Sequence, residues 1–166
     1  NLQNLSFILR FAKVYKLNKS KLIKTVNSFK GLDYRQQIIY KNKFVTILND
    51  SKSTSFSSSL NLLKSYKNIF WILGGLAKKG DKLELSSKYY KNIKGYIFGK
   101  DKSFFAKKLN NKIKSNTYKN LENILKKIVQ EIKLKKNKHS YILFSPSAAS
   151  FDKFKNFEDR GNYFNY

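Results

Sequence analysis

The sequence contains no cysteine, no methionine, a single proline and a single histidine. The absence of cysteine excludes disulfides, thiolate metal sites and a cysteine nucleophile, and it is typical of a reducing compartment. Long apolar runs are also missing, because the longest extends only from Ile69 to Leu73 and a membrane span needs about 20 residues. We therefore expect a cytoplasmic protein with no membrane partner.

Arginine is scarce although positive charge is abundant. Lysine and arginine together number 35 against 10 acidic residues, which gives a net charge of +25. Such a balance suggests a polyanion partner, and a nucleic-acid-binding module is one alternative function. Only Arg10, Arg35 and Arg160 are arginines, however, and the lysines are spread over the whole chain together with many Asn, Ile and Tyr residues. We interpret this as the effect of AT-rich codons and expect no nucleic-acid partner.

The length of 166 residues fits one ordinary domain. Because the chain begins with Asn1 rather than with an initiator methionine or a signal peptide, we expect its true N-terminus upstream. Apolar residues at helical spacing predict one helix over 2–12 and a second over 22–29, capped by Ser20 and ended by Gly31.

The remainder alternates between strands and helices. Short apolar runs predict strands at 37–40, 44–48, 69–73, 95–98 and 141–144. The segments between them predict helices after the serine-rich stretch 51–59, at 83–90, 103–113 and 121–132, and from 151 onward. This order predicts an α/β fold with a Rossmann-like, doubly wound, mostly parallel sheet flanked by helices.

Polar or glycine clusters follow four of these strands, at 49–52, 74–75, 99–101 and 145–147. Parallel strands carry ligands beyond their carboxyl ends, so we expect a site along that edge. A P-loop of the form GxxxxGK[ST] is missing, and so are the glycines of a hydrolase nucleophile elbow around Ser145, Ser147 and Ser150. His139 lacks a supporting motif, and we expect it at the surface before a strand.

Five ordered segments resemble the C-terminal domain of the Mur ligases. They are GLDYR at 31–35, NDSKST at 49–54, LGG at 73–75 with Lys78 and Asp81, SPSAASFD at 145–152 and FKNFEDRG at 154–161. The last two are similar to the ligases that add D-glutamate. The resemblance implies that residues 1–30 are the C-terminal tail of a central ATP-binding domain and that 31–166 form the amino-acid-binding domain.

The resemblance also implies a role for individual residues. Lys52 is expected to neutralise the transferring phosphoryl group, and Asp50 to hold the nucleotide. The other expected site residues are Thr54, Lys78, Ser150 and Phe157 for D-glutamate, and Asn1, Asn4, Tyr34 and Arg35 for the nucleotide. Further implied partners are UDP-N-acetylmuramoyl-L-alanine, ATP with Mg²⁺ bound mostly by the missing upstream domains, and those domains themselves. We expect a monomer, no metal ligand in this chain, and no activity of the chain alone.

Each of these residues also has a structural interpretation. Ser51 or Ser53 can cap a helix, and so can Ser150. Phe157 can be a core aromatic residue, Arg35 can form a salt bridge, and Asp152 can pair with Arg160. Tyr34 stands where the family usually carries histidine, and Ala77 and Lys79 also depart from its pattern. The alternatives within the class are another Mur ligase, a folylpolyglutamate-type ligase, or a degraded relative.

Overall fold

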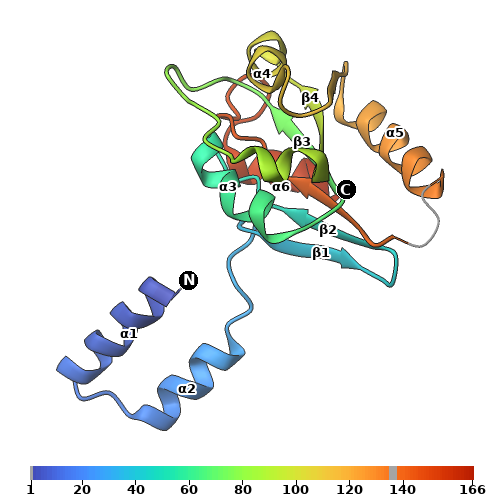
Figure 1. Ribbon diagram of the computed structural model, residues 1–166. Coiled ribbons are helices and arrows are strands. Elements are labelled where there is room, and N and C mark those ends of the chain that lie inside the picture. Colours follow the sequence, from blue (N-terminus) through green and yellow to red (C-terminus); the bar gives the residue numbers. More distant parts are fainter. Residues whose placement is uncertain (1, 135–137) are drawn as a thin grey trace. The chain divides into compact units, whose positions relative to one another are not determined.

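The computed structural model describes residues 2–134 and 138–166 (Figure 1). Asn1, an expected nucleotide contact, lies outside the described residues. The chain divides into two compact units, Asn1–Gly31 and Leu32–Tyr166. None of the helices in the described ranges is long and apolar enough to cross a membrane.

The first unit consists of helix α1 (Leu2–Val14) and helix α2 (Lys19–Ser28). The expected cap of α2 was wrong, because Asn18 caps the helix: its side chain accepts the backbone N–H of Lys21 at 3.0 Å, and the helix begins at Lys19. The helix also ends earlier than Gly31. Ala12 is buried, whereas large apolar side chains on both helices are exposed, among them Phe7, Val14 and Ile23.

The second unit is built on one sheet. Its strands are β1 (Gln37–Lys41), β2 (Val45–Asn49), β3 (Ile69–Gly74), β4 (Ile93–Phe98), β5 (Ser115–Thr117) and β6 (Ser140–Phe144). Within the described residues they follow the spatial order β1-β2-β6-β3-β4-β5. Strand β1 is antiparallel to β2, and every other neighbouring pair is parallel. The expected mostly parallel α/β fold is confirmed.

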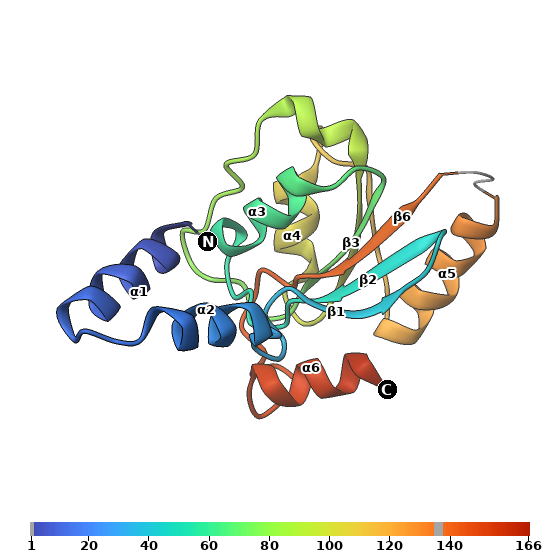
Figure 2. The same cartoon turned by 90° about the horizontal axis from the view of Figure 1, so that it is seen from below.

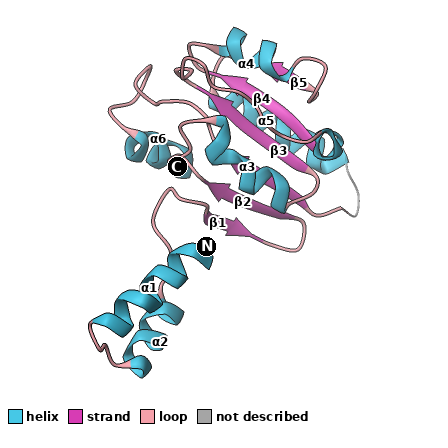
Figure 3. Ribbon diagram, turned by 60° about the vertical axis from the view of Figure 1, so that its left-hand side comes forward, coloured by secondary structure: helices cyan, strands magenta, loops and turns pink. Residues whose placement is uncertain are grey.

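Helices cover both faces of this sheet (Figures 2 and 3). They are α3 (Phe56–Ser65), α4 (Lys102–Leu109), α5 (Leu121–Leu134) and α6 (Phe157–Asn165), with a short 3₁₀ helix η1 at Ser87–Asn92. Side chains of β3 alternate between the faces, so that Trp71 packs with α3 and α4 while Phe70 and Ile72 pack with α5 and α6. Every residue of β3 is buried, as its continuous apolar run predicts.

The helix expected at 83–90 was wrong. Leu83 and Leu85 are both buried, and only the extended backbone, with its period of two, places both side chains on one side. The helical turn begins later, at Ser87. The sequence did not indicate β5, because this three-residue edge strand is polar and largely exposed. The helix over 103–113 ends earlier than expected, at Leu109.

Two helix starts also differ from expectation. Neither Ser51 nor Ser53 caps α3, because Ser55 takes that position in a capping box with Ser58. The last helix begins at Phe157 rather than near 151. The side chain of Asn156 accepts the backbone N–H of Asp159 at 2.7 Å, so the segment before it stays irregular.

Candidate functional site

The carboxyl ends of β2, β6, β3 and β4 meet at one edge of the sheet, as expected. Backbone hydrogen bonds tie the loops that follow them. The N–H of Asp50 donates to Phe144 O at 2.7 Å, and that of Gly74 to Pro146 O at 2.9 Å. Leu76 and Ala149 exchange both of their backbone hydrogen bonds, at 3.0 and 2.9 Å. The four clusters identified in the sequence therefore belong to one interlocked surface.

Glycine is required where the loops cross. Gly74 has φ +128°, and a Cβ there would lie 1.9 Å from the carbonyl oxygen of Phe98. Gly75 has φ +134°, with the carbonyl oxygen of Ala149 at 2.6 Å from the position of a Cβ. Both positions combine a left-handed backbone with a close approach of another chain segment, so a side chain cannot be accommodated.

Asp50 lies directly after β2 and is buried. Its Oδ1 accepts the backbone N–H of Gln36 at 3.1 Å, and its Oδ2 accepts the hydroxyl of Ser145 at 2.9 Å. Burial raises the pKa of this carboxyl to about 6, against the lowering effects of the two hydrogen bonds and of the Arg35 charge. Asp50 is thus a fixed hydrogen-bond acceptor whose charge is only partly compensated.

Lys52 is held beside Phe157. Its backbone N–H donates to the carbonyl of Tyr34 at 3.0 Å, and its Nζ lies 3.9 Å from the centroid of the Phe157 ring. Phe157 opens α6 and is half-buried, and its carbonyl accepts the hydroxyl of Ser51 at 2.8 Å. The fold therefore brings the expected catalytic lysine and an expected substrate residue, 105 positions apart in the numbering, into direct contact.

Arg160 was expected to pair with Asp152, and this expectation was wrong. The guanidinium is buried and donates to Ser51 Oγ at 3.0 Å, to Ser51 O at 2.7 Å and to Ala148 O at 2.9 Å. Asp152 instead accepts the backbone N–H of Lys100 at 3.1 Å. Burial lowers the pKa of Arg160 to about 10, and the Asp152 charge opposes that shift. Arg160 is thus the link between α6 and the loops after β2 and β6.

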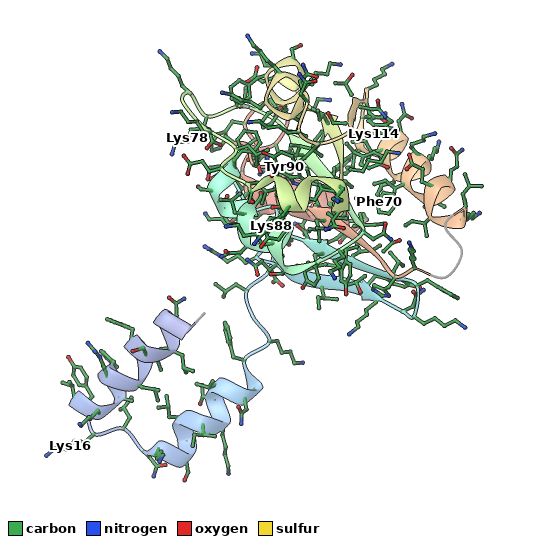
Figure 4. All side chains as sticks on the ribbon, in the orientation of Figure 1. Lys16, Phe70, Lys78, Lys88, Tyr90 and Lys114 are labelled. Atoms are coloured by element: carbon green, nitrogen blue, oxygen red, sulfur yellow. The ribbon has the colours of Figure 1, made fainter. Side chains whose placement is uncertain are left out.

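Three of the expected D-glutamate residues lie on separate loops. Ser150 is buried, and within the described part of the chain its hydroxyl has no protein partner. Thr54 and Lys78 are exposed. Lys78 lies on the outer loop after β3 (Figure 4), which is fixed at both ends because Asp101 accepts the N–H of Ala77 and Asp81 accepts the N–H of Phe56. The helix-cap interpretation of Ser150 does not hold, since Asn156 caps the helix that follows.

The expected nucleotide residues Tyr34 and Arg35 precede β1. Tyr34 has φ +59°, and its hydroxyl donates to Asn162 Oδ1 at 2.6 Å. A Cβ at Gly161 would lie 2.3 Å from the tyrosine ring, so this ring lies directly against the backbone of α6. Arg35 is exposed and has no ion pair in the described residues. Asn4 is exposed on α1, in the other unit.

A group of buried hydroxyls at this edge was missed by the sequence analysis. Ser59 Oγ lies 2.7 Å from Ser53 Oγ, 2.7 Å from Ser145 Oγ and 2.6 Å from Ser147 Oγ. All four side chains are buried. The only signal in the sequence was the serine-rich stretch 51–59, which resembles a linker until the fold buries part of it.

The described residues contain no group of three or more His, Cys, Asp or Glu side chains placed to hold a metal ion. Hydroxyls, a buried carboxylate, lysines and one buried guanidinium make up the chemistry of this edge. Such a set can bind and position a phosphorylated or carboxylated ligand by hydrogen bonds and charge.

Comparison with known proteins identifies relatives along nearly the whole chain. The chain is 35% identical over 164 residues to the UDP-N-acetylmuramoylalanine--D-glutamate ligase of Wolbachia sp. subsp. Brugia malayi. It is 33% identical over 165 residues to the ligase of the same name from Rickettsia prowazekii and 33% identical over 168 residues to that from Francisella philomiragia. Each match covers 99% of this chain but only 33%, 37% and 40% of the respective relative.

No family model matches the chain. It spans little more than a third of the length of these curated relatives. Over nearly its whole length, the chain is homologous to a C-terminal part of the UDP-N-acetylmuramoylalanine--D-glutamate ligases.

Proposed function

We propose that this chain is the amino-acid-binding part of an ATP-dependent ligase that joins D-glutamate to UDP-N-acetylmuramoyl-L-alanine in peptidoglycan biosynthesis. The observation that carries the proposal is the convergence of Asp50, Lys52, Ser150 and Phe157 at the carboxyl edge of the parallel sheet, in a chain homologous to such ligases. A reaction that consumes ATP and a UDP-linked precursor belongs in the cytoplasm.

The reaction requires cancellation of negative charge. ATP phosphorylates the carboxylate of the UDP-linked substrate, the amine of D-glutamate attacks the acyl phosphate, and phosphate leaves. Lys52 is the residue to which we assign the stabilisation of the phosphoryl oxygens, because its backbone is fixed by Tyr34 and its ammonium group lies against Phe157. A cation placed in advance lowers the barrier without reorganisation at the moment of reaction.

D-glutamate carries two carboxylates and therefore needs at least two anchoring points. We assign these to Lys78 together with the hydroxyls of Thr54 and Ser150, and we assign the wall of the pocket to Phe157. The hydroxyl of Ser150 supports this assignment, since within the described residues no protein hydrogen bond occupies it. The separation of these residues on three loops suits a ligand with charges at both ends.

The nucleotide is assigned to Asp50, Tyr34 and Arg35. Asp50 has acceptor capacity for ribose hydroxyls beyond its two protein hydrogen bonds. We propose that residues 1–30 are the tail of the preceding ATP-binding domain. The side chains of the described residues do not form a set that fits Mg²⁺, so we assign the ligands of this ion to the part of the enzyme outside the chain.

The test measures phosphate release by the full-length protein with ATP, magnesium and UDP-N-acetylmuramoyl-L-alanine, with D-glutamate or other amino acids in parallel. We expect turnover only with D-glutamate. We expect Lys78→Ala to lower kcat/KM for D-glutamate by roughly 100-fold, about the effect of losing a charged contact to a carboxylate. The matched control is Lys79→Ala, since Lys79 is an exposed lysine in the same loop.

Turnover with a different amino acid would support the proposed ligase activity and contradict D-glutamate as its substrate. Equal losses in the Lys78 and Lys79 variants would contradict the assigned pocket. The 166-residue chain alone is expected to show no ATP hydrolysis, because it contains no phosphate-binding loop.

A further inference from the structure

The hydroxyl group of Ser59 has three serine hydroxyls within hydrogen-bond distance, from the loop after β2 and the loop after β6. Ser59 itself belongs to α3 and has no solvent exposure, and its partners are Ser53, Ser145 and Ser147. A hydroxyl has one proton to donate and can accept two hydrogen bonds. Ser59 therefore uses its complete hydrogen-bonding capacity on these three residues.

The direction of these hydrogen bonds follows from Asp50. An ionised carboxylate only accepts, so the proton of Ser145 is committed to Asp50 Oδ2 at 2.9 Å. The hydroxyl of Ser145 can then only accept from Ser59. The carbonyl of Ser145 is not the better acceptor, since it already receives Trp71 Nε1 at 2.8 Å and lies 3.4 Å from Ser59 Oγ.

With its own proton given to Ser145, Ser59 accepts from Ser147 and can accept from Ser53, whose hydroxyl also lies 2.8 Å from Ser58 Oγ. The result is a directed chain of hydrogen bonds in which Ser147 donates to Ser59, Ser59 donates to Ser145, and Ser145 donates to the carboxylate of Asp50. Ser53 lies between Lys52 and Thr54, and Ser147 lies in the loop that leads to Ser150. The segments joined by Ser59 are thus those that carry the expected nucleotide, phosphoryl and D-glutamate contacts.

We propose that Ser59 is a positioning residue of this site, which holds the carboxylate of Asp50 in place through Ser145 and fixes the two flanking loops through Ser53 and Ser147. The inference rests on the proposed function for its catalytic consequence, whereas the hydrogen-bond arrangement itself does not depend on that function. Ser59 touches no substrate and acts only through these three residues.

The first test is a carbon-13 NMR titration of the Asp50 carboxyl in the 166-residue chain. Removing the Ser59 hydroxyl weakens the hydrogen bond that Ser145 donates, because donors in a connected set polarise one another. We expect Ser59→Ala to raise the pKa of Asp50 by about 0.2–0.6 unit. Ser59→Thr, which retains the hydroxyl, is expected to restore the original value.

The matched control is Ser140→Ala. Ser140 is equally buried, but it lies at the opposite end of β6, where its hydroxyl accepts from Asn68. This variant is expected to leave the pKa of Asp50 unchanged. Ser53→Ala and Ser147→Ala each remove one donor to Ser59, so each should produce a smaller rise than Ser59→Ala, and they decide the matter if Ser59→Ala does not fold.

The second test uses the full-length enzyme. We expect Ser59→Ala to lower kcat about tenfold with saturating substrates, because a displaced catalytic group is costly even when the substrates bind. Ser140→Ala is expected to keep the wild-type kcat. If the wild-type enzyme has no ligase activity, the proposed function fails, and the NMR titration still decides the role of Ser59. Equal behaviour of Ser59→Ala and Ser140→Ala in both measurements would overturn the inference.

Discussion

Asp50 and Arg160 are charged side chains that the fold buries at the same edge of the sheet, and neither forms an ion pair within the described residues. Each is stabilised by neutral partners: Asp50 by Ser145 and a backbone N–H, and Arg160 by Ser51 and a carbonyl. Charges in such surroundings lose part of their hydration, and the nearby charges of Arg35 and Asp152 offset only part of that loss. A bound ligand could compensate both charges, by donating hydroxyl groups to Asp50 or by placing a negative charge near Arg160.

The burial of Asp50 predicts a dependence of stability on pH. Its pKa is about 6 in the folded chain against an ordinary value of 3.8, so the folded state binds more protons between these pH values. The stabilising contribution is present below pH 4 and is lost as the pH rises through 6. Asp50→Asn cannot lose a proton and so lacks this loss of stability. The unfolding free energy of Asp50→Asn minus that of the wild type should therefore increase by roughly 2–3 kcal/mol between pH 4 and pH 7.

Urea denaturation at several pH values measures this difference. Asp33→Asn, which changes an exposed carboxylate, serves as the reference for the general effect of charge. A constant difference between wild type and Asp50→Asn over the whole range would contradict the prediction.

At the scale of elements, α6 is the part of the fold that completes the candidate site. It contributes Phe157, which lies beside Lys52, and Gly161, against which the ring of Tyr34 packs. It also contributes Arg160, which donates hydrogen bonds to the loops after β2 and β6. Phe164 stacks on Phe144 of β6 with ring centroids 4.2 Å apart. Loss of the Arg160 hydrogen bonds would therefore loosen the helix at the end nearest the site while its apolar anchor remains.

We expect Arg160→Met to destabilise the second unit by roughly 3 kcal/mol, because two buried carbonyls and one hydroxyl lose a charged donor. Arg35→Met changes an exposed arginine and should alter the unfolding free energy by no more than about 0.5 kcal/mol. Chemical denaturation of both variants provides the comparison. A loss in Arg160→Met as small as that in Arg35→Met would show that α6 is held by its apolar contacts alone.

At the scale of the whole molecule, the charge of +25 is almost uncompensated. The only ion pair in the described ranges joins Lys94 to Glu131. A hollow of about 730 Å³ at the amino-terminal edge of the sheet gathers six of the lysines. They are Lys67, Lys91, Lys94, Lys112, Lys114 and Lys138, of which Figure 4 labels Lys114. Like charges placed together destabilise a compact state.

We therefore expect salt to stabilise the protein. Raising NaCl from 10 to 200 mM shortens the range of charge interactions from about 30 Å to less than 10 Å and should raise Tm by several degrees. Lys112→Gln with Lys114→Gln should reduce this dependence more than Lys126→Gln with Lys133→Gln, which removes the same charge from exposed positions on α5. Equal slopes in the two double variants would mean that position within the fold does not matter.

The amino-acid sequence by itself determined the fold class and the edge at which the candidate site lies. The apolar run of β3, the strand pair 37–48 and the stripe of α5 each carry a period that the backbone must follow to bury its side chains. Motif order then assigned Asp50, Lys52 and Ser150 to that edge, because parallel strands end together.

Only the tertiary structure decided which partners these residues have. The Asp152–Arg160 pair and the caps at Ser20, Ser51 and Ser53 were wrong, because hydrogen bonds go to whichever group lies within about 3 Å after folding. The contact of the Tyr34 ring with Gly161 joins segments 127 positions apart in the numbering, and the hydrogen bond between Ser59 and Ser145 joins segments 86 positions apart. Local sequence patterns report on periods of two or four residues, and contacts over such separations exist only once the sheet has formed.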